Sequence, residues 1–269
     1  MTRLYAYCLC DGVEAGRLDL GGEAGVGGCA ARVLTVGGFA AVVGDFAGER
    51  VGVGREELMA HNRVNGLVLA LTTPLPFRFG TLVTAGRLGE YVRRNEAALR
   101  AGLGRVEGCV EMGVKIIRRP AGAGACEESG GPDEALPSGK GGVPIALTAG
   151  GEPSVERGEE GAAPAGLSAP RAGRGTAYLA ARRRAIMGDE RLRAGAEEIA
   201  AGLAKFLSGV VRESSERLSP AEALAVRAAH LVERGRVAEY QSRLREFGAA
   251  RPGLRLLASG PWPPYSFAA

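Results

Sequence analysis

The sequence predicts an α+β protein built from two small ferredoxin-like α/β sandwich domains, the second with an added long helix. Two observations carry this prediction. Strand-like and helix-like segments alternate in a similar order in both halves of the chain, which is typical of small sheets covered by helices. Between the halves, the stretch 118–173 has 20 glycines or prolines among its 56 residues and almost no large apolar side chains. Such a stretch buries too little surface to offset its ordering entropy.

We therefore expect three parts in the chain. These are an N-terminal domain (1–117), a flexible linker or insert (118–173), and a C-terminal domain (174–269) in which a helix precedes an α+β fold and a proline-rich aromatic tail. A chain of 269 residues is long enough for two domains of this size, because domains commonly contain 50–200 residues.

The first half of the N-terminal domain reads as a strand, a loop and a hairpin. The aromatic and apolar run at 3–10 predicts a buried strand. The glycine-rich stretch 11–31 predicts a surface excursion. A hairpin is expected over 33–43, because Gly37 and Gly38 supply the positive φ angles that tight turns require.

The rest of this domain alternates helices with strands. A helix is expected over 55–71, ended by Pro74 and Pro76. Its apolar face would consist of Leu58, Val64, Leu67, Val68 and Leu71. A strand (77–83), a second helix (85–101) and a last strand (106–117) follow from the apolar spacing.

The C-terminal domain begins with the most regular helical pattern in the chain, over 174–211. Apolar residues three and four positions apart form a coiled-coil-like seam made of Ala196, Ile199, Leu203, Phe206 and Val210. Alternation at period two predicts a strand over 224–232. A helix (235–249) and a final strand (254–258) complete the domain.

Composition narrows the class of protein and its compartment. The net charge of +4 is too small to argue for nucleic-acid binding, and only three of the 34 basic residues are lysines. The sequence shows no secretory signal and no apolar run long enough to span a membrane. Five cysteines without metal-ligand spacing indicate free thiols in a reducing cytoplasm.

Catalytic chemistry is hard to find in this sequence. The two histidines, His61 and His230, fall in different domains, and no metalloprotease, hydrolase, zinc or phosphate-loop motif occurs. We expect His61 to be partly buried and hydrogen-bonded, and His230 to face the core and not to act as a ligand. No catalytic residue, cofactor site or metal site is predicted.

Two motifs in the sequence are unusual. In the run from Pro76 to Thr81, Arg78 stands between two phenylalanines, and on a strand this would place both rings on one face and the guanidinium on the other. In the run from Gly260 to Phe267, three prolines stiffen an aromatic segment that holds Trp262, Pro263, Pro264, Tyr265 and Phe267. Such a segment either packs back onto its domain or docks a partner.

These motifs carry a resemblance to a known family. The segment GPWPPYSF at 260–267 resembles the closing motif of the gas vesicle GvpF/GvpL family. The stretch from His61 to the Leu-Pro-Phe-Arg-Phe-Gly run at 75–80 is similar to that family, with Arg78, Phe79 and Gly80 closing the run. The opening Leu-Tyr-Ala-Tyr at 4–7 and the helix start that contains Tyr178 and Leu179 fit as well.

The resemblance implies a non-enzymatic accessory or minor structural protein of gas vesicles. Such a protein would bind the small, hydrophobic shell subunit, and other gas vesicle accessory proteins, and limit shell aggregation during nucleation. The resemblance also implies an N-terminal modified ferredoxin-like domain and a cytoplasmic, gas vesicle location. It implies neither a nucleic-acid partner nor a membrane span.

A carrier for an apolar subunit needs an apolar or edge-strand surface and no catalytic pocket. The edge of the N-terminal sheet and the helical seam at 196–210, with Leu203 and Phe206, are both candidates. The alternative is an RNA-binding module on a ferredoxin-like sheet, although Arg78-Phe79-Gly80 has the wrong order for the RNA-recognition signature. A third possibility is an enzyme that uses Arg78 and His61.

Overall fold

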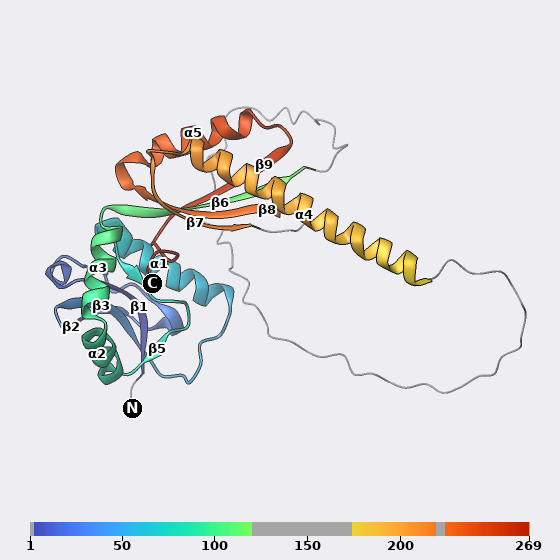
Figure 1. Ribbon diagram of the computed structural model, residues 1–269. Coiled ribbons are helices and arrows are strands. Elements are labelled where there is room, and N and C mark those ends of the chain that lie inside the picture. Colours follow the sequence, from blue (N-terminus) through green and yellow to red (C-terminus); the bar gives the residue numbers. More distant parts are fainter. Residues whose placement is uncertain (1–2, 120–173, 219–223, 269) are drawn as a thin grey trace, which may run out of the picture. The chain divides into compact units, whose positions relative to one another are not determined.

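The computed structural model describes residues 3–119, 174–218 and 224–268, with side chains from residue 190 onward in the long helix (Figure 1). The expected flexible insert lies outside the described residues from position 120 on. The described part contains two antiparallel sheets with helices packed on them. The predicted fold class is therefore confirmed.

The first sheet has the strand order β2-β3-β1-β4, with β5 also paired to β1. Its strands are β1 (Arg3–Asp11), β2 (Ala31–Val36), β3 (Phe39–Phe46), β4 (Leu75–Pro76) and β5 (Leu82–Val83). This is the strand order of a ferredoxin-like sheet, but the crossover between β1 and β2 holds only single 3₁₀ turns at Gly12–Glu14 and Val26–Gly28 where that fold has a helix. The N-terminal domain is a modified ferredoxin-like fold for this reason.

The predicted hairpin is confirmed, with β2 and β3 joined by Gly37 and Gly38. Both glycines have positive φ angles, 54° and 77°, which suit the right-handed twist of a two-residue hairpin. The predicted excursion at 11–31 is the long connection before this hairpin.

Helices cover both faces of the first sheet. On one face, α1 (Arg55–Leu71) packs through Ala60, Val64 and Val68 against Tyr5 and Tyr7 of β1. On the other face, α2 (Ala85–Arg94) and α3 (Glu96–Val106) bury an apolar set made of Leu88, Val92, Leu99 and Val106. The single helix expected over 85–101 is broken at Asn95, whose side chain and backbone N–H both bond to the Tyr91 carbonyl.

The second sheet has the order β7-β8-β6-β9. Along the chain its elements are β6 (Cys109–Arg118), α4 (Arg174–Phe206), β7 (Val211–Leu218), β8 (Leu224–Glu233), α5 (Val237–Ala249) and β9 (Leu254–Trp262). The sequence β-α-β-β-α-β with this strand order is the ferredoxin-like topology. The C-terminal domain therefore has the fold that the alternation of elements predicted.

Strand β6 corrects the expected domain boundary. We expected it to close the N-terminal domain at 117, but it pairs with β8 and β9 and is a central strand of the second sheet. Its alternating apolar residues indicate a strand without indicating the sheet that it joins. The chain passes from one sheet to the other at Glu107 and Gly108, between α3 and β6.

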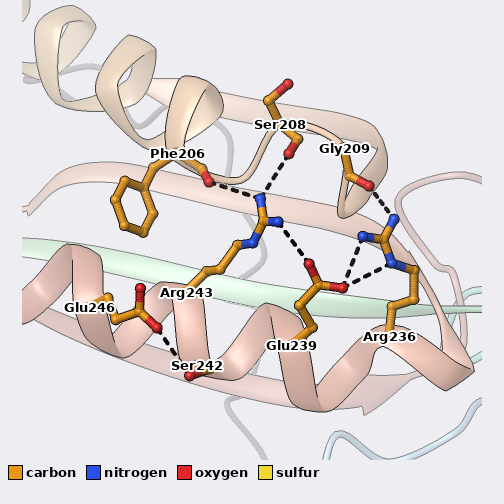
Figure 2. A network of polar contacts seen from close by, with 8 residues as sticks. All are labelled: Phe206, Ser208, Gly209, Arg236, Glu239, Ser242, Arg243 and Glu246. Carbon is orange, nitrogen blue, oxygen red and sulfur yellow. Dashed lines mark hydrogen bonds and ion pairs between the residues drawn. The ribbon is translucent and has the colours of Figure 1, made fainter.

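The helix expected over 174–211 ends at Phe206, and β7 follows it. Beyond the end of α4, Arg243 of α5 donates hydrogen bonds to the carbonyls of Phe206 and Ser208, and Arg236 donates to the Gly209 carbonyl (Figure 2). Glu239 accepts from both arginines. These bonds satisfy carbonyls that a helix end leaves without intrahelical partners, and they attach α5 to the end of α4.

Most of the predicted seam of α4 is buried, but two of its five residues are more exposed than expected. Ala196, Leu203 and Val210 lie in the core of the second domain, together with Ala200 and Leu207. Ile199 is only partly buried, and Phe206 is 37% exposed with its ring 5.8 Å from that of Phe247. The seam therefore packs inside its own domain and does not form the docking surface that we considered.

Two further features belong to the described part of the chain. No helix there combines the length and the apolarity needed to cross a membrane. The four cysteines that the structure describes are free thiols, and Cys8, Cys10 and Cys109 are buried.

Candidate functional site

His61 is the centre of the most distinctive side-chain cluster in the protein. It lies on the face of α1 that meets the first sheet and is 2% exposed. Four aromatic rings surround its imidazole with centroids 5.6 to 6.0 Å away: those of Tyr5, Tyr7, Phe79 and Tyr265. The cluster therefore brings together residues from β1, α1, the loop after β4 and the C-terminal end of the described chain.

Both ring nitrogens of His61 have hydrogen-bond partners. The Tyr5 hydroxyl lies 2.9 Å from Nδ1, and the Tyr265 hydroxyl lies 2.9 Å from Nε2. The Tyr5 hydroxyl also accepts the backbone N–H of Gly80 at 3.1 Å. The Tyr5 hydroxyl therefore joins the histidine of α1 to the turn that contains Gly80.

Asn65 completes the cluster one helical turn after His61. Its amide lies 3.1 Å from His61 Nε2 and 3.1 Å from the Tyr265 hydroxyl, with its Oδ1 otherwise lacking a partner. The Asn65 Nδ2 group therefore faces both His61 Nε2 and the Tyr265 hydroxyl at this end of the cluster.

The cluster is electrically neutral at physiological pH. Burial lowers the pKa of His61 to about 4, and desolvation raises the pKa values of Tyr5 and Tyr265 well above the usual value of a phenol. His61 is buried, uncharged and bonded at both nitrogens, so its role here is to join elements. General acid or base catalysis would require a ring nitrogen within reach of a substrate.

The Arg-Phe-Gly run corrects one sequence interpretation. We expected a strand over 77–83, but residues 77–81 form a turn between two-residue strands, and Gly80 has a φ of 83°. The two phenylalanine rings do not share a face: Phe79 meets His61 edge-on, whereas Phe77 packs against Tyr91. The Arg78 side chain is exposed and borders a shallow pocket beside α2.

The C-terminal segment (263–268) packs back onto the molecule. Pro263 and Pro264 are buried, and Phe267 is 2% exposed within the apolar cluster between the first sheet and α3. The backbone N–H and hydroxyl of Ser266 donate to the Glu111 carboxylate at 2.7 and 2.9 Å. Trp262, the last residue of β9, is only half-buried.

These contacts make the C-terminal segment a connection between the two sheets. Glu111 belongs to β6 of the second sheet, whereas Tyr265 reaches His61 on the helix of the first. Arg105 of α3 donates to the carbonyl of Phe267. Burial raises the pKa of Glu111, and its bonds to Ser266 act in the opposite direction.

The structure thus brings four of the predicted site residues together in or next to the His61 cluster: His61, Phe79, Gly80 and Tyr265. Phe267 lies in the apolar cluster on the other face of the first sheet. Leu203 is in the core of the second domain, and Phe206 lies at the end of α4. Tyr178 and Leu179 lie in α4, but their side chains are outside the described part.

Three residues of the site were missed as functional candidates. Tyr5 is in the aromatic run of β1, Asn65 is four residues after His61, and Glu111 looks like an ordinary strand residue. Asn65 had a usable signal, because residues four apart share a helix face, and Tyr5 stands in the opening motif at 4–7. The partner of Glu111 is 155 positions away in the sequence.

Removing one hydroxyl tests the cluster. Tyr265→Phe should lower the free energy of unfolding by about 1–2 kcal/mol, because the His61 imidazole and the Asn65 amide both lose a buried hydrogen-bond partner. Urea unfolding followed by circular dichroism measures this loss. Tyr91→Phe is the matched control, since Tyr91 is exposed and its hydroxyl has no hydrogen bond within the described residues. Equal effects of the two changes would contradict the role of the cluster.

The fold and these contacts define the class: a protein of two ferredoxin-like domains, joined by a C-terminal segment that packs on a buried histidine. The family model for the gas vesicle synthesis protein GvpL/GvpF matches residues 3–135 and 146–269. The chain therefore belongs to the GvpL/GvpF family of gas vesicle proteins.

Named relatives agree with this assignment. Gas vesicle protein L2 of Halobacterium salinarum is 29% identical over 98% of this chain and 90% of its own length. Gas vesicle protein L of a Streptomyces species is 31% identical over 92% of this chain and 86% of its own length.

Solved structures share the fold. The crystal structure of gas vesicle protein GvpF from Anabaena sp. PCC7120 matches with a TM-score of 0.67 at 16% identity, over 100% of this chain and 97% of that one. The GvpF structure from Microcystis aeruginosa matches with a TM-score of 0.64 at 15% identity, over the whole of both chains.

Proposed function

We propose that this protein binds the hydrophobic shell subunit of the gas vesicle and limits its aggregation during nucleation and assembly. It acts in the cytoplasm and at the gas vesicle as a non-enzymatic accessory or minor structural protein. Membership of the GvpL/GvpF family supports a role in gas vesicles. The finer assignment depends on whether the molecule offers an apolar surface to an apolar partner.

The observation that carries the proposal is an exposed apolar strip on α1. Leu67 and Leu71 lie on its outer side and are 38% and 53% exposed. Met59 is also exposed, but Arg63, which pairs with Glu23, separates it from the two leucines. Gly66 and Ala70 between them are also exposed, so the last two turns of the helix present no charge on this side. Soluble proteins scatter exposed apolar residues singly, and a continuous strip is typical of a binding surface.

The strip also corrects the sequence analysis. We expected Leu67 and Leu71 on the core face of this helix, but the positions that face the core hold His61 and Asn65 together with Ala60, Val64 and Val68. The helix therefore buries two polar side chains and exposes two leucines. The hydrogen bonds to Tyr5 and Tyr265 offset the cost of this arrangement, and the leucines remain available to a partner.

Co-expression tests the proposal. The tagged wild-type chain should keep the shell subunit in the soluble fraction and co-purify with it. The double variant Leu67→Glu, Leu71→Glu should lose most of the bound subunit, because two charges on the strip would have to be desolvated in the complex.

The matched control replaces two exposed apolar residues outside α1. Val13→Glu and Val53→Glu add the same charge at more exposed positions and should leave co-purification unchanged. Shell subunit recovered only in pellets with the wild-type chain would overturn the proposed function. Retention of the subunit by the α1 variant would exclude the strip as the contact.

A further inference from the structure

The second sheet has one face that its own helices leave open. Val114 and Ile116 of β6 and Val226 of β8 are buried in the core beneath α4 and α5. Because successive side chains on a strand point to opposite faces, Lys115 and Arg227 lie on the other face. On β9, Leu254 and Leu256 pack toward the core, so Arg255 and Leu257 are on the open face as well.

The end of this face near the first sheet is occupied. Leu231 and Cys109 belong to the apolar cluster that also holds Phe267 and α3 residues, and Glu111 binds Ser266. The far end is different: Lys115, Arg217, Arg227 and Arg255 are all exposed there. No hydrogen bond or ion pair joins these four side chains to any other described residue.

Three of the cations are aligned across the sheet. Arg217 of β7 is directly opposite Arg227 of β8, and Arg227 is directly opposite Lys115 of β6. Neighbouring strands are about 4.8 Å apart, so like charges in such pairs repel one another. A sheet that needed only stability would place opposite charges at these positions. The three cations of this row face solvent without a carboxylate partner among the described residues.

The geometry points to an acidic polypeptide segment as the occupant of this cationic row. Guanidinium groups bind carboxylates through paired hydrogen bonds, and a segment with carboxylates along one side would neutralise three strands at once. Leu257, opposite Lys115 and 39% exposed, adds an apolar contact next to the charges. This surface shares no residue with the α1 strip, so the inference does not depend on the proposed binding of the shell subunit.

Charge alone would also suit RNA, but the composition of the face favours protein. Sheets that bind single-stranded RNA stack bases on aromatic side chains. The described residues at the far end of this face are cationic, aliphatic or small, with Ile117, Ser215 and Ser259 beside the four cations, and none is aromatic.

Binding of a glutamate-rich peptide of about ten residues to the full chain tests the inference, measured by fluorescence anisotropy between about 50 and 300 mM salt. A glutamine-rich peptide of the same length and oligo-uridine RNA are the comparison probes. The triple variant Lys115→Gln, Arg217→Gln, Arg227→Gln should weaken glutamate-peptide binding about tenfold or more.

The matched control is Arg87→Gln, Arg94→Gln, Arg245→Gln. It removes the same charge from exposed helix positions whose side chains have no partners among the described residues, and binding should change less than about twofold. Equal weakening by both triple variants would show attraction by net charge alone and overturn the inference. Tighter binding of the RNA probe, or no binding of the glutamate peptide, would overturn it as well.

A charge reversal keeps the test independent of folding defects. Arg227→Glu places an acid between Arg217 and Lys115, where it forms favourable cross-strand pairs, and it should reduce glutamate-peptide binding without loss of thermal stability. Undiminished binding by this variant would place the peptide elsewhere.

Discussion

Phe267→Ala is expected to lower the free energy of unfolding by about 3–5 kcal/mol, the usual cost of removing a fully buried phenylalanine ring. Phe267 is 2% exposed and shares its apolar cluster with Leu99 and Val106 of α3 and with Leu231 of the second sheet. The change would leave a cavity where elements of both domains meet. The loss should therefore affect the coupling of the two domains as well as their stability.

Urea unfolding followed in parallel by circular dichroism and by the fluorescence of Trp262, the only tryptophan, measures both effects. In the wild-type chain the two probes should report one transition. In Phe267→Ala the fluorescence transition should come at a lower urea concentration than the circular dichroism transition. Phe206→Ala is the matched control, because this ring is 37% exposed and its loss should cost about 1 kcal/mol. A similar cost for both substitutions would contradict the structural role of the C-terminal segment.

Local pattern was a reliable guide to the elements whose partners are near in the sequence. The strand at 3–10, the hairpin around Gly37 and Gly38, and the helices at 55–71 and 235–249 all occur close to the expected positions. In each case the signal is internal to the element: apolar spacing, a glycine pair, or a flanking proline.

Elements that depend on distant partners could not be predicted in this way. Strand β7 has only Val211 and Leu218 as apolar residues, at its two ends, because it is an exposed edge strand stabilised by pairing with β8. Strand β6 was recognised but assigned to the wrong sheet. The turn at 77–81 was taken for a strand because its two phenylalanines are two positions apart, as on one face of a strand. In the structure the two rings pack against different neighbours.

The same distinction between local pattern and distant partners applies to the candidate site. A partly buried, hydrogen-bonded His61 was expected from its place between apolar turns; the structure confirms the hydrogen bonds and shows that the residue is fully buried. That Tyr265, 204 positions later, holds its Nε2 follows only from the fold. The exposure of Leu67 was hidden for a related reason: periodicity shows that a helix has an apolar stripe, but not whether that stripe meets the core or a partner.

Acidification from pH 7 to pH 4 is expected to destabilise the protein through its two histidines. Burial lowers the pKa of both His61 and His230 from an ordinary value of 6.5 to about 4. Between these two values the unfolded chain binds a proton at each histidine and the folded chain does not. The stabilisation is therefore complete above pH 6.5 and is lost as the pH falls toward 4, by up to about 3 kcal/mol per histidine.

Other groups leave a window in which the histidines dominate. His61 faces tyrosines, and His230 bonds Tyr240 through Nδ1 at 2.7 Å, so no carboxylate in these hydrogen bonds would favour the charged imidazole. Glu111, whose pKa is raised by burial, opposes the effect. Asp45 and Glu239, whose pKa values are lowered by hydrogen bonds from arginines, add to the loss only near pH 4.

The measurement is the slope of unfolding free energy against pH. Near pH 5 the wild-type slope should be about 2–2.5 kcal/mol per pH unit, which corresponds to nearly two protons taken up on unfolding. His61→Gln and His230→Gln should each halve that slope, whatever they do to the stability at pH 7. Because the slope counts protons and not contacts, a single variant that retains the full wild-type slope would mean that the replaced histidine is already charged in the folded state.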